Sequence, residues 1–243
     1  MARSTEKKRD PKASLALLWG EQEQPRRGPK PSLTAGRIVA AAIALADAEG
    51  LDAVSMQRVA AELEVTTMAL YRYVPSKTDL VDLMVDAAGG APPAVAELPG
   101  GWREPLAEWA RQCWALYRRH PWILTATAMR RQHMGPGQLA WLDAALAVLA
   151  RTGLPAARQH DTFLLVIGHI RSLAQQLVDA DEEADGEWQR LTGELLDRHR
   201  DRFPALTAAI AAGAFAPAQP DEDPLEFGLQ RILDGVAALV ERG

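Results

Sequence analysis

The sequence predicts an all-α protein. Apolar residues recur at helical spacing along most of the 243-residue chain. Only 6% of the residues are aromatic, alanine is abundant and β-branched runs are short, which argues against strands. Hydrophobic residues make up 48% of the composition, enough to fill a core and to exclude a wholly disordered chain. We therefore expect about ten helices, arranged as an N-terminal arm and two helical units.

Residues 1–31 are predicted to form a basic, flexible arm. They hold eight basic and four acidic residues. Pro29 and Pro31 exclude a helix around them, whereas the apolar residues 15–19 are compatible with one short helix. Arg26, Arg27 and Lys30 directly precede the next unit, where they can follow phosphates or enter a minor groove, as homeodomain arms do. A disordered solubilising tail is the alternative.

Residues 32–78 are predicted to form a three-helix unit. Ser32, Ser55 and Thr66 are the expected N-caps, and Gly50 is expected to end the first helix in the left-handed conformation. The second and third helices have the dimensions of a helix-turn-helix, whose second helix enters the major groove by its N-terminal residues. An ordinary pair of core helices would give the same pattern. The expected helices cover residues 32–49, 55–63 and 66–73.

The fourth helix begins at a capping box formed by Ser76 and Asp79 and runs towards Gly89. A Pro- and Gly-rich break over residues 91–101 then joins it to the remaining helices. We place the boundary of a regulatory and dimerisation domain at residues 79–243. Its further helices are expected over residues 102–119, 121–131, 136–152, 155–179, 186–201, 203–212 and 222–242.

Composition excludes several functional classes. The single cysteine, Cys113, cannot form an intrachain disulfide, and we interpret it as a buried small residue. The five histidines lack the spacing of a metal site, so we expect no metal and no cofactor. Nucleophile elbows, phosphate loops and zinc-protease motifs are absent from the sequence, so we expect no enzyme and assign no catalytic residue. Without an apolar run of membrane-spanning length or a signal-peptide core, the chain is expected in the cytoplasm, away from membranes.

The charge distribution matters more than its total. The chain has 27 Lys and Arg against 32 Asp and Glu, a net charge of −5, which alone would argue against nucleic-acid binding. Residues 32–78 hold only four basic and five acidic residues, while the excess positive charge lies on the arm. Most of the negative charge belongs to residues 84–243, so the total does not exclude DNA binding by the N-terminal part.

A longer string of residues resembles the tetracycline-repressor (TetR) family of transcriptional regulators. The similarity covers roughly residues 33–86, and it is specific because spacing and identity agree across four helices. A looser similarity to the regulatory domain of that family covers residues 120–122, 153–155 and 227–235. The matching N-terminal segments are residues 38–42, 49–51, 55–60, 63, 65, 70–74 and 76–80. The resemblance implies a helix-turn-helix DNA-binding domain followed by a helical ligand-binding and dimerisation domain.

The resemblance also implies which residues meet double-stranded DNA. Thr67 can hydrogen-bond to a base edge, and Met68 or Ala69 can touch a thymine methyl group. Two tyrosines match positions that contact the DNA backbone, and one lysine matches a phosphate anchor. For Tyr71 the alternative is a core aromatic ring with a solvated hydroxyl. The implied DNA-binding residues are Gln57, Arg58, Thr66, Thr67, Met68, Ala69, Tyr71, Tyr73 and Lys77.

Glu64 departs from the family pattern, which usually has glycine in the turn between the two DNA-binding helices. A residue other than glycine in the left-handed conformation costs on the order of 1 kcal/mol. We therefore expect Glu64→Gly to stabilise the protein if the turn is left-handed.

Two helices of the C-terminal unit are strongly apolar on one face, which is typical of a four-helix dimer interface. A homodimer would let two short recognition helices read two half-sites. The alternative is that both are internal core helices. The expected interface residues are Phe163, Ile167, Ile170, Leu229, Leu233, Val236 and Val240.

Aromatic and polar residues of the same unit are candidates for a small-molecule site, although an aromatic stripe is also typical of a core. The sequence thus predicts a dimeric repressor that a small-molecule effector releases from a palindromic operator. The alternative is a ligand-independent regulator whose C-terminal domain only dimerises. The candidate ligand-binding residues are Trp102, Trp109, Tyr117, Thr127, Met129, Trp141, His169 and Arg171.

Overall fold

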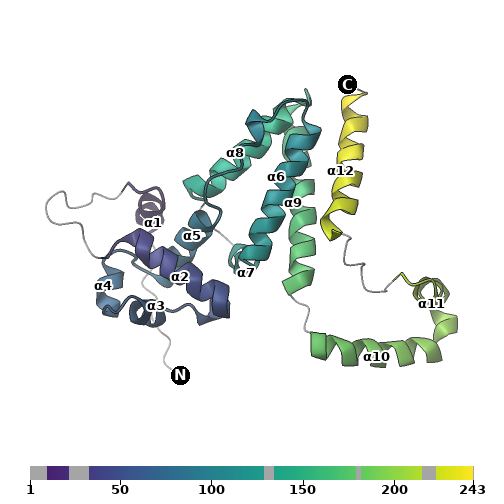
Figure 1. Cartoon of the computed structure of the whole chain (residues 1–243), viewed down its shortest axis with the longest axis horizontal. Helices are drawn as coiled ribbons and strands as arrows, with labels where there is room; N and C mark the ends of the chain where they lie inside the picture. Colours follow the sequence, from purple (N-terminus) through teal and green to yellow (C-terminus); the bar gives the residue numbers. More distant parts are fainter. Residues whose placement is uncertain (1–9, 22–32, 129–133, 179–181, 215–222, 243) are drawn as a thin grey trace.

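The computed structural model describes residues 10–21, 33–128, 134–178, 182–214 and 223–242, and these are helical with no strand (Figure 1). The predicted all-α class is confirmed. Short 3₁₀ helices cover Leu51–Ala53, Val95–Glu97 and Arg200–Arg202. The α-helices are α1 (Pro11–Leu18), α2 (Ala35–Glu49), α3 (Met56–Glu62), α4 (Thr67–Tyr71), α5 (Lys77–Ala88), α6 (Arg103–Arg119), α7 (Trp122–Ala128), α8 (Pro136–Ala150), α9 (Ala156–Val178), α10 (Glu182–Arg198), α11 (Pro204–Ala211) and α12 (Pro224–Val240).

Helices α2, α3 and α4 form the N-terminal unit, and α5 packs along α2 (Figure 1). Ser55 and Thr66 are N-caps as predicted, since their hydroxyls accept the backbone N–H groups of Arg58 and Ala69. The first cap is Thr34, whose Oγ1 lies 3.2 Å from the backbone nitrogen of Arg37, whereas Ser32 lies outside the described residues. The core of this unit consists of Ile38, Ala42, Val59, Leu70, Val74, Leu80 and Met84.

The end of α2 differs from the expected left-handed cap. Gly50 has φ 82° and ψ 169°, an extended conformation with positive φ. This region is accessible essentially to glycine alone, so the residue type was correctly interpreted although the conformation was not.

Helix α1 corrects the expectation of a flexible arm throughout residues 1–31. Leu17 and Leu18 are buried, and α1 packs against α5. The Ser14 hydroxyl donates a 2.7 Å hydrogen bond to the buried carboxylate of Asp79, which also accepts a 2.6 Å bond from the Ser76 hydroxyl. Ser76 therefore caps α5, since its hydroxyl accepts the Asp79 backbone N–H at 3.0 Å, and the Asp79 carboxylate binds that hydroxyl and a helix 65 residues away in sequence. Sequence alone could not show this partner.

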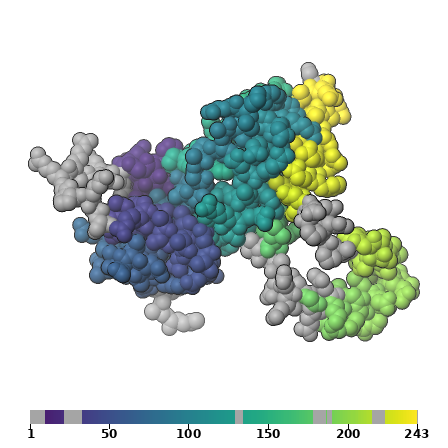
Figure 2. Space-filling view, in the orientation of Figure 1, coloured from purple at the N-terminus to yellow at the C-terminus, as the bar shows by residue number. Residues whose placement is uncertain are grey.

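The C-terminal unit is a bundle in which α9 packs against α6, α8 and α12, while α10 and α11 project away from it (Figures 1 and 2). Helix α5 also contacts α7 and α8, so it belongs to the packing of both units. Ion pairs fasten α6 to α12, with Arg103 on Asp234 at 2.6 Å and Arg111 on Glu226 at 2.7 Å. In the described part of the chain, every helix is too short or too polar to cross a bilayer.

Candidate nucleic-acid interface and internal cavity

Helices α3 and α4 are joined by a tight turn at Glu64, whose φ of 55° is positive. The backbone nitrogens of Glu64 and Val65 donate to the carbonyls of Ala61 and Ala60, each at 3.0 Å, and so close the end of α3. Leu70 is fully buried in the hydrophobic core, and Val65 is half-buried and packs against that core. The backbone conformation expected at the helix-turn-helix corner is therefore present, with a glutamate in it.

The solvent side of the two helices presents a set of side chains that we call the reading face. Met68 is 74% exposed and Tyr71 is 43% exposed. The other exposed members are Gln57 and Thr66, and Lys77 is exposed at the start of α5. Thr67 is half-buried beside them, whereas Ala69 and Tyr73 are half-buried with side chains packed against the core. Five of these predicted residues are thus exposed, and Thr67, Ala69 and Tyr73 are half-buried.

Arg58 is paired with a carboxylate in the DNA-free protein. Its Nη1 and Nη2 atoms donate to the two carboxylate oxygens of Glu49 at 2.7 and 2.6 Å, a bidentate pair that joins α3 to the end of α2. The hydrogen-bonded guanidinium lowers the pKa of Glu49, and the carboxylate raises the pKa of Arg58. Both side chains are exposed, so the expected DNA contact of Arg58 stays a prediction, and it would compete with Glu49 for the guanidinium. Arg26, Arg27 and Lys30 lie outside the described residues.

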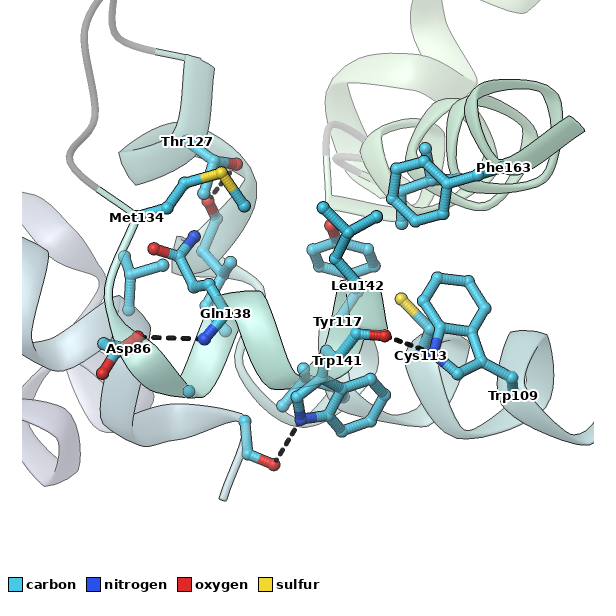
Figure 3. A pocket seen from close by; sticks show the side chains of 16 residues that line it. Asp86, Trp109, Cys113, Tyr117, Thr127, Met134, Gln138, Trp141, Leu142 and Phe163 are labelled. Carbon is cyan, nitrogen blue, oxygen red and sulfur yellow. Dashed lines mark hydrogen bonds between the residues drawn. The ribbon is translucent and has the colours of Figure 1, made fainter. Parts of the chain in front are cut away.

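A cavity of about 160 Å³, partly open to solvent, lies between α5, α6, α7, α8 and α9 (Figure 3). Four predicted residues line it: Trp109, Tyr117, Thr127 and Trp141. The other four predicted residues do not line it or fall outside the structure. Trp102 and Arg171 are absent from the lining, although Arg171 donates hydrogen bonds to Tyr117 and Thr127, which belong to it. His169 Nε2 lies 3.2 Å from the Leu225 carbonyl oxygen instead, and Met129 lies outside the described residues. No metal-binding group of side chains occurs in the described ranges.

The sequence analysis missed the part of the cavity wall that α5 contributes. Val85, Asp86 and Gly89 come from its last turns, and Gln138 comes from the first turn of α8. The sequence analysis placed α5 in the regulatory domain from residue 79 onwards and gave only Lys77, at its start, to DNA, but it named no α5 residue as part of a ligand site. The apolar spacing of α5 could have signalled a second buried face, but not which cavity that face would meet.

Aromatic rings build one wall of the cavity. The Trp109 ring meets Trp141 at a centroid distance of 6.3 Å and Phe163 at 5.8 Å, both edge to face. The Trp109 indole nitrogen donates to the Trp141 carbonyl oxygen at 3.0 Å, which fixes its orientation (Figure 3). These contacts leave flat apolar surface facing the cavity.

Polar groups converge beside this wall at Arg171. Its Nη1 donates to Thr127 Oγ1 at 2.6 Å and to the Tyr117 hydroxyl at 3.2 Å, and the guanidinium lies 5.7 Å from the centre of the Tyr117 ring. Burial raises the pKa of Tyr117 to about 12, so its hydroxyl stays protonated at neutral pH. Burial likewise raises the pKa of the nearby Cys113 thiol to about 12.

The end of α5 is fastened to α8 at the edge of the cavity. Asp86 Oδ1 accepts the backbone N–H of Gln138 at 2.9 Å, and the Trp141 indole donates to the Gly89 carbonyl oxygen at 3.2 Å (Figure 3). A side chain at Gly137 would collide with the Asp86 backbone oxygen, so glycine permits this close approach. A group entering the cavity would therefore meet the same residues that hold α5.

Most of the side chains expected at a dimer interface pack inside the protomer. Ile170, Leu229, Leu233 and Val236 are buried, and Phe163 and Ile167 line the cavity, while Val240 is half-buried. The helices nevertheless expose a different apolar face. Its large members are Leu164 at 50%, Leu165 at 59%, Phe227 at 76% and Leu239 at 48% exposure. Periodicity identified two-faced apolar helices but selected the face that packs within the protomer.

Two family models match most of the chain. Residues 38–84 match the model described as bacterial regulatory proteins, tetR family, and residues 95–240 match that of the tetracyclin repressor-like C-terminal domain. The chain is 40% identical to the HTH-type transcriptional repressor DrrR1 of Streptomyces coeruleorubidus over 236 residues, covering 93% of this chain and 86% of that protein. It is 31% identical to an HTH-type transcriptional regulator of Saccharopolyspora erythraea, covering 91% of each.

Solved structures of a regulator from Streptomyces coelicolor have a similar fold. Apo ActR from Streptomyces coelicolor superposes with a TM-score of 0.74 at 26% identity, covering 88% of this chain and 99% of ActR. ActR in complex with actinorhodin gives a TM-score of 0.73 at 27% identity, with the same coverage.

Proposed function

The chain belongs to the tetracycline-repressor family of transcriptional regulators, and we propose that it is a dimeric repressor that a small-molecule effector releases from a palindromic operator. The name of the similar DrrR1 protein, a transcriptional repressor, supports the direction of regulation. The ActR structures, which were solved with and without actinorhodin, support an effector.

The exposed reading face supports DNA recognition by α3 and α4. Met68 and Thr67 occupy the first turn of α4, where a recognition helix meets base edges. Lys77 lies at the first turn of α5, where the helix N-terminus also favours a phosphate. Because Glu49 competes for Arg58, we assign phosphate contacts first to Lys77 and Tyr71.

The exposed apolar face of α9 and α12 supports dimerisation. A five-residue recognition helix reads too few base pairs for a specific site, and two-fold symmetry doubles the contact. Leu164, Leu165 and Phe227 leave apolar surface in water unless a second copy covers it. We assign the dimer contact to this face, in place of the buried residues that periodicity suggested.

The observation that carries the proposed effector response is the position of α5. Its first residue, Lys77, belongs to the candidate DNA surface, and its last turns supply Val85, Asp86 and Gly89 to the cavity wall. Twelve residues span about 18 Å, so one rigid helix connects the two places. A ligand that displaces the Asp86–Gln138 contact would tilt α5 and change the separation of the two reading faces in a dimer.

The test begins by selecting bound DNA from a random pool with the full-length protein. We expect a palindromic sequence, lost by the Tyr71→Ala, Lys77→Ala double variant. Compounds that raise the melting temperature are then tested for release of that DNA, and a cavity-filling Ile167→Phe variant should bind DNA but resist release. Recovery of no specific sequence would overturn the proposal. Binding compounds that never release DNA would favour a ligand-independent regulator.

A further inference from the structure

We infer that the effector is an anionic aromatic compound whose negatively charged oxygen group binds at Arg171 while its rings lie against Trp109, Trp141 and Phe163. This inference rests on the proposed function, because it identifies the chemical class of ligand for the same cavity. Its basis is a half-buried cation without a counter-charge beside an aromatic wall.

Arg171 contacts only neutral groups among the described residues. Its partners are the Thr127 hydroxyl, the Tyr117 hydroxyl and the Tyr117 ring, and no carboxylate of the described part of the chain lies within ion-pair distance. A guanidinium removed from water without a carboxylate or phosphate partner is unfavourable. In contrast, Arg58, Arg103 and Arg111 each meet a carboxylate.

The neutral partners cannot supply the missing charge. The Thr127 hydroxyl donates its hydrogen to the Ile123 carbonyl oxygen at 2.7 Å, so towards Arg171 it acts only as a neutral acceptor. Both hydrogen bonds of Arg171 use Nη1, and the fork still has N–H groups on Nη2 and Nε. The Tyr117 hydroxyl accepts from Arg171, and its own hydrogen can be donated to a ligand oxygen. This corner therefore offers donors and positive charge, which a carboxylate or phenolate accepts best.

Arg171 is not itself a lining residue but is hydrogen-bonded to two residues that are, Tyr117 and Thr127, and the lining selects the body of the ligand. Trp109, Trp141 and Phe163 present ring surface, and Ile123 and Ile167 add aliphatic surface. The one carboxylate in the described lining, Asp86, is held by the backbone of Gln138 at the start of α8, on the other side of the cavity from Phe163 and Trp109 (Figure 3). A flat aromatic compound with one anionic edge can therefore contact the aromatic side chains and place its charge towards Arg171.

The test uses matched acids and amides of three sizes: benzoic acid, 2-naphthoic acid and anthraquinone-2-carboxylic acid, each with its carboxamide. Each pair differs only in the charge of one group. Titration calorimetry of the full-length protein at pH 7.5 should show that, for at least one size, the acid binds at least about tenfold more tightly than the amide. Arg171→Gln should reduce that ratio to about one while the amide still binds.

Arg158→Gln is the matched control. Arg158 lies on the same helix, but it is exposed and paired with Asp161, so the variant should keep the preference for the acid. Equal affinity for acid and amide at every size, a preference that survives Arg171→Gln, or no binding by any acid would each overturn the inference. Operator release is measured in parallel by fluorescence anisotropy. Release by a neutral aromatic compound would leave the proposed function standing while the anionic class fails.

Discussion

The carboxylate of Asp47 lies 2.6 Å from Nδ1 of His120, which connects the last turn of α2 to the junction between α6 and α7. The same carboxylate oxygen accepts a 2.7 Å hydrogen bond from the Trp122 indole. Both donors are on buried residues of the C-terminal unit, whereas Asp47 belongs to the N-terminal unit. This contact and the Asp86–Gln138 contact therefore hold the two units together at separate points.

Asp47→Ala should lower the free energy of unfolding by about 1–3 kcal/mol, because two buried donors lose their acceptor. Urea denaturation of the full-length protein measures the change. Asp52→Ala is the control: Asp52 is exposed in the neighbouring 3₁₀ helix, and its loss should change stability by less than about 0.5 kcal/mol. Equal effects of the two substitutions would contradict a coupling role for Asp47.

Glu64→Gly should raise the free energy of unfolding by about 1 kcal/mol, because glycine adopts the φ of 55° without steric cost. Glu62→Gly is the matched control, since Glu62 ends α3 in helical conformation, where glycine should cost about 1 kcal/mol. Guanidinium denaturation compares the two. Unchanged or reduced stability of Glu64→Gly would show that the turn gains something from the glutamate.

Lys77→Ala should weaken operator binding to a similar extent for all sequences and lower the slope of log affinity against log salt by about one. The reason is that we propose a phosphate contact for Lys77 at the start of α5, which the variant would lose. Fluorescence anisotropy at several salt concentrations gives the slope. Arg158→Ala, which removes an exposed positive charge on α9, should leave it unchanged. A slope that falls equally in both variants would mean that only net charge matters.

Glu226→Gln removes an ion pair between α12 and α6. It should lower the free energy of unfolding at neutral pH by no more than about 1 kcal/mol, since the Arg111–Glu226 pair is about one-third exposed. Arg111 lowers the pKa of Glu226, so the ionised form is favoured in the folded state. The pair therefore stabilises the protein above the ordinary glutamate pKa of about 4.3, and this contribution disappears as the pH falls through the lower folded pKa. Thermal denaturation should accordingly show a difference between wild type and variant at pH 7 that vanishes in acid. Glu97→Gln, at an exposed site, should show no such difference.

Cys113 should be nearly inert towards thiol reagents in the native protein. Burial raises the pKa of its thiol to about 12, so little thiolate exists at pH 8. We expect reaction with a disulfide reagent to be at least about a hundredfold slower than in guanidinium, where an ordinary pKa of about 8.5 applies. Because the chain has a single cysteine, absorbance reports this site alone, and Cys113→Ser provides the blank. Comparable rates in the two conditions would contradict burial of the cavity wall at this residue.

Local signals in the sequence were sufficient for the helices and for the position of the reading face. The hydroxyls of Ser55, Thr66 and Ser76 cap the helices that they were expected to cap, because capping depends on backbone groups only three residues away. The positive φ at Glu64 was expected from the resemblance, because the family usually has glycine in this turn. The exposure of Met68 was implied by the same resemblance, and that of Tyr71 agrees with the expected outward position of its tip.

Contacts between distant residues were decided only in the tertiary structure. Periodicity shows that α9 and α12 have apolar faces, but it does not say whether Ile170 and Leu233 meet a partner or their own protomer. Nor does it show that Glu49 occupies Arg58, that Ser14 holds Asp79, or that α5 ends in the cavity wall. The sequence by itself thus determined the all-α class and the surface offered to DNA, because these arise from interactions within a few turns. Which apolar face is internal, and that Arg171 lies among neutral groups beside an aromatic wall, depend on how the helices pack in three dimensions.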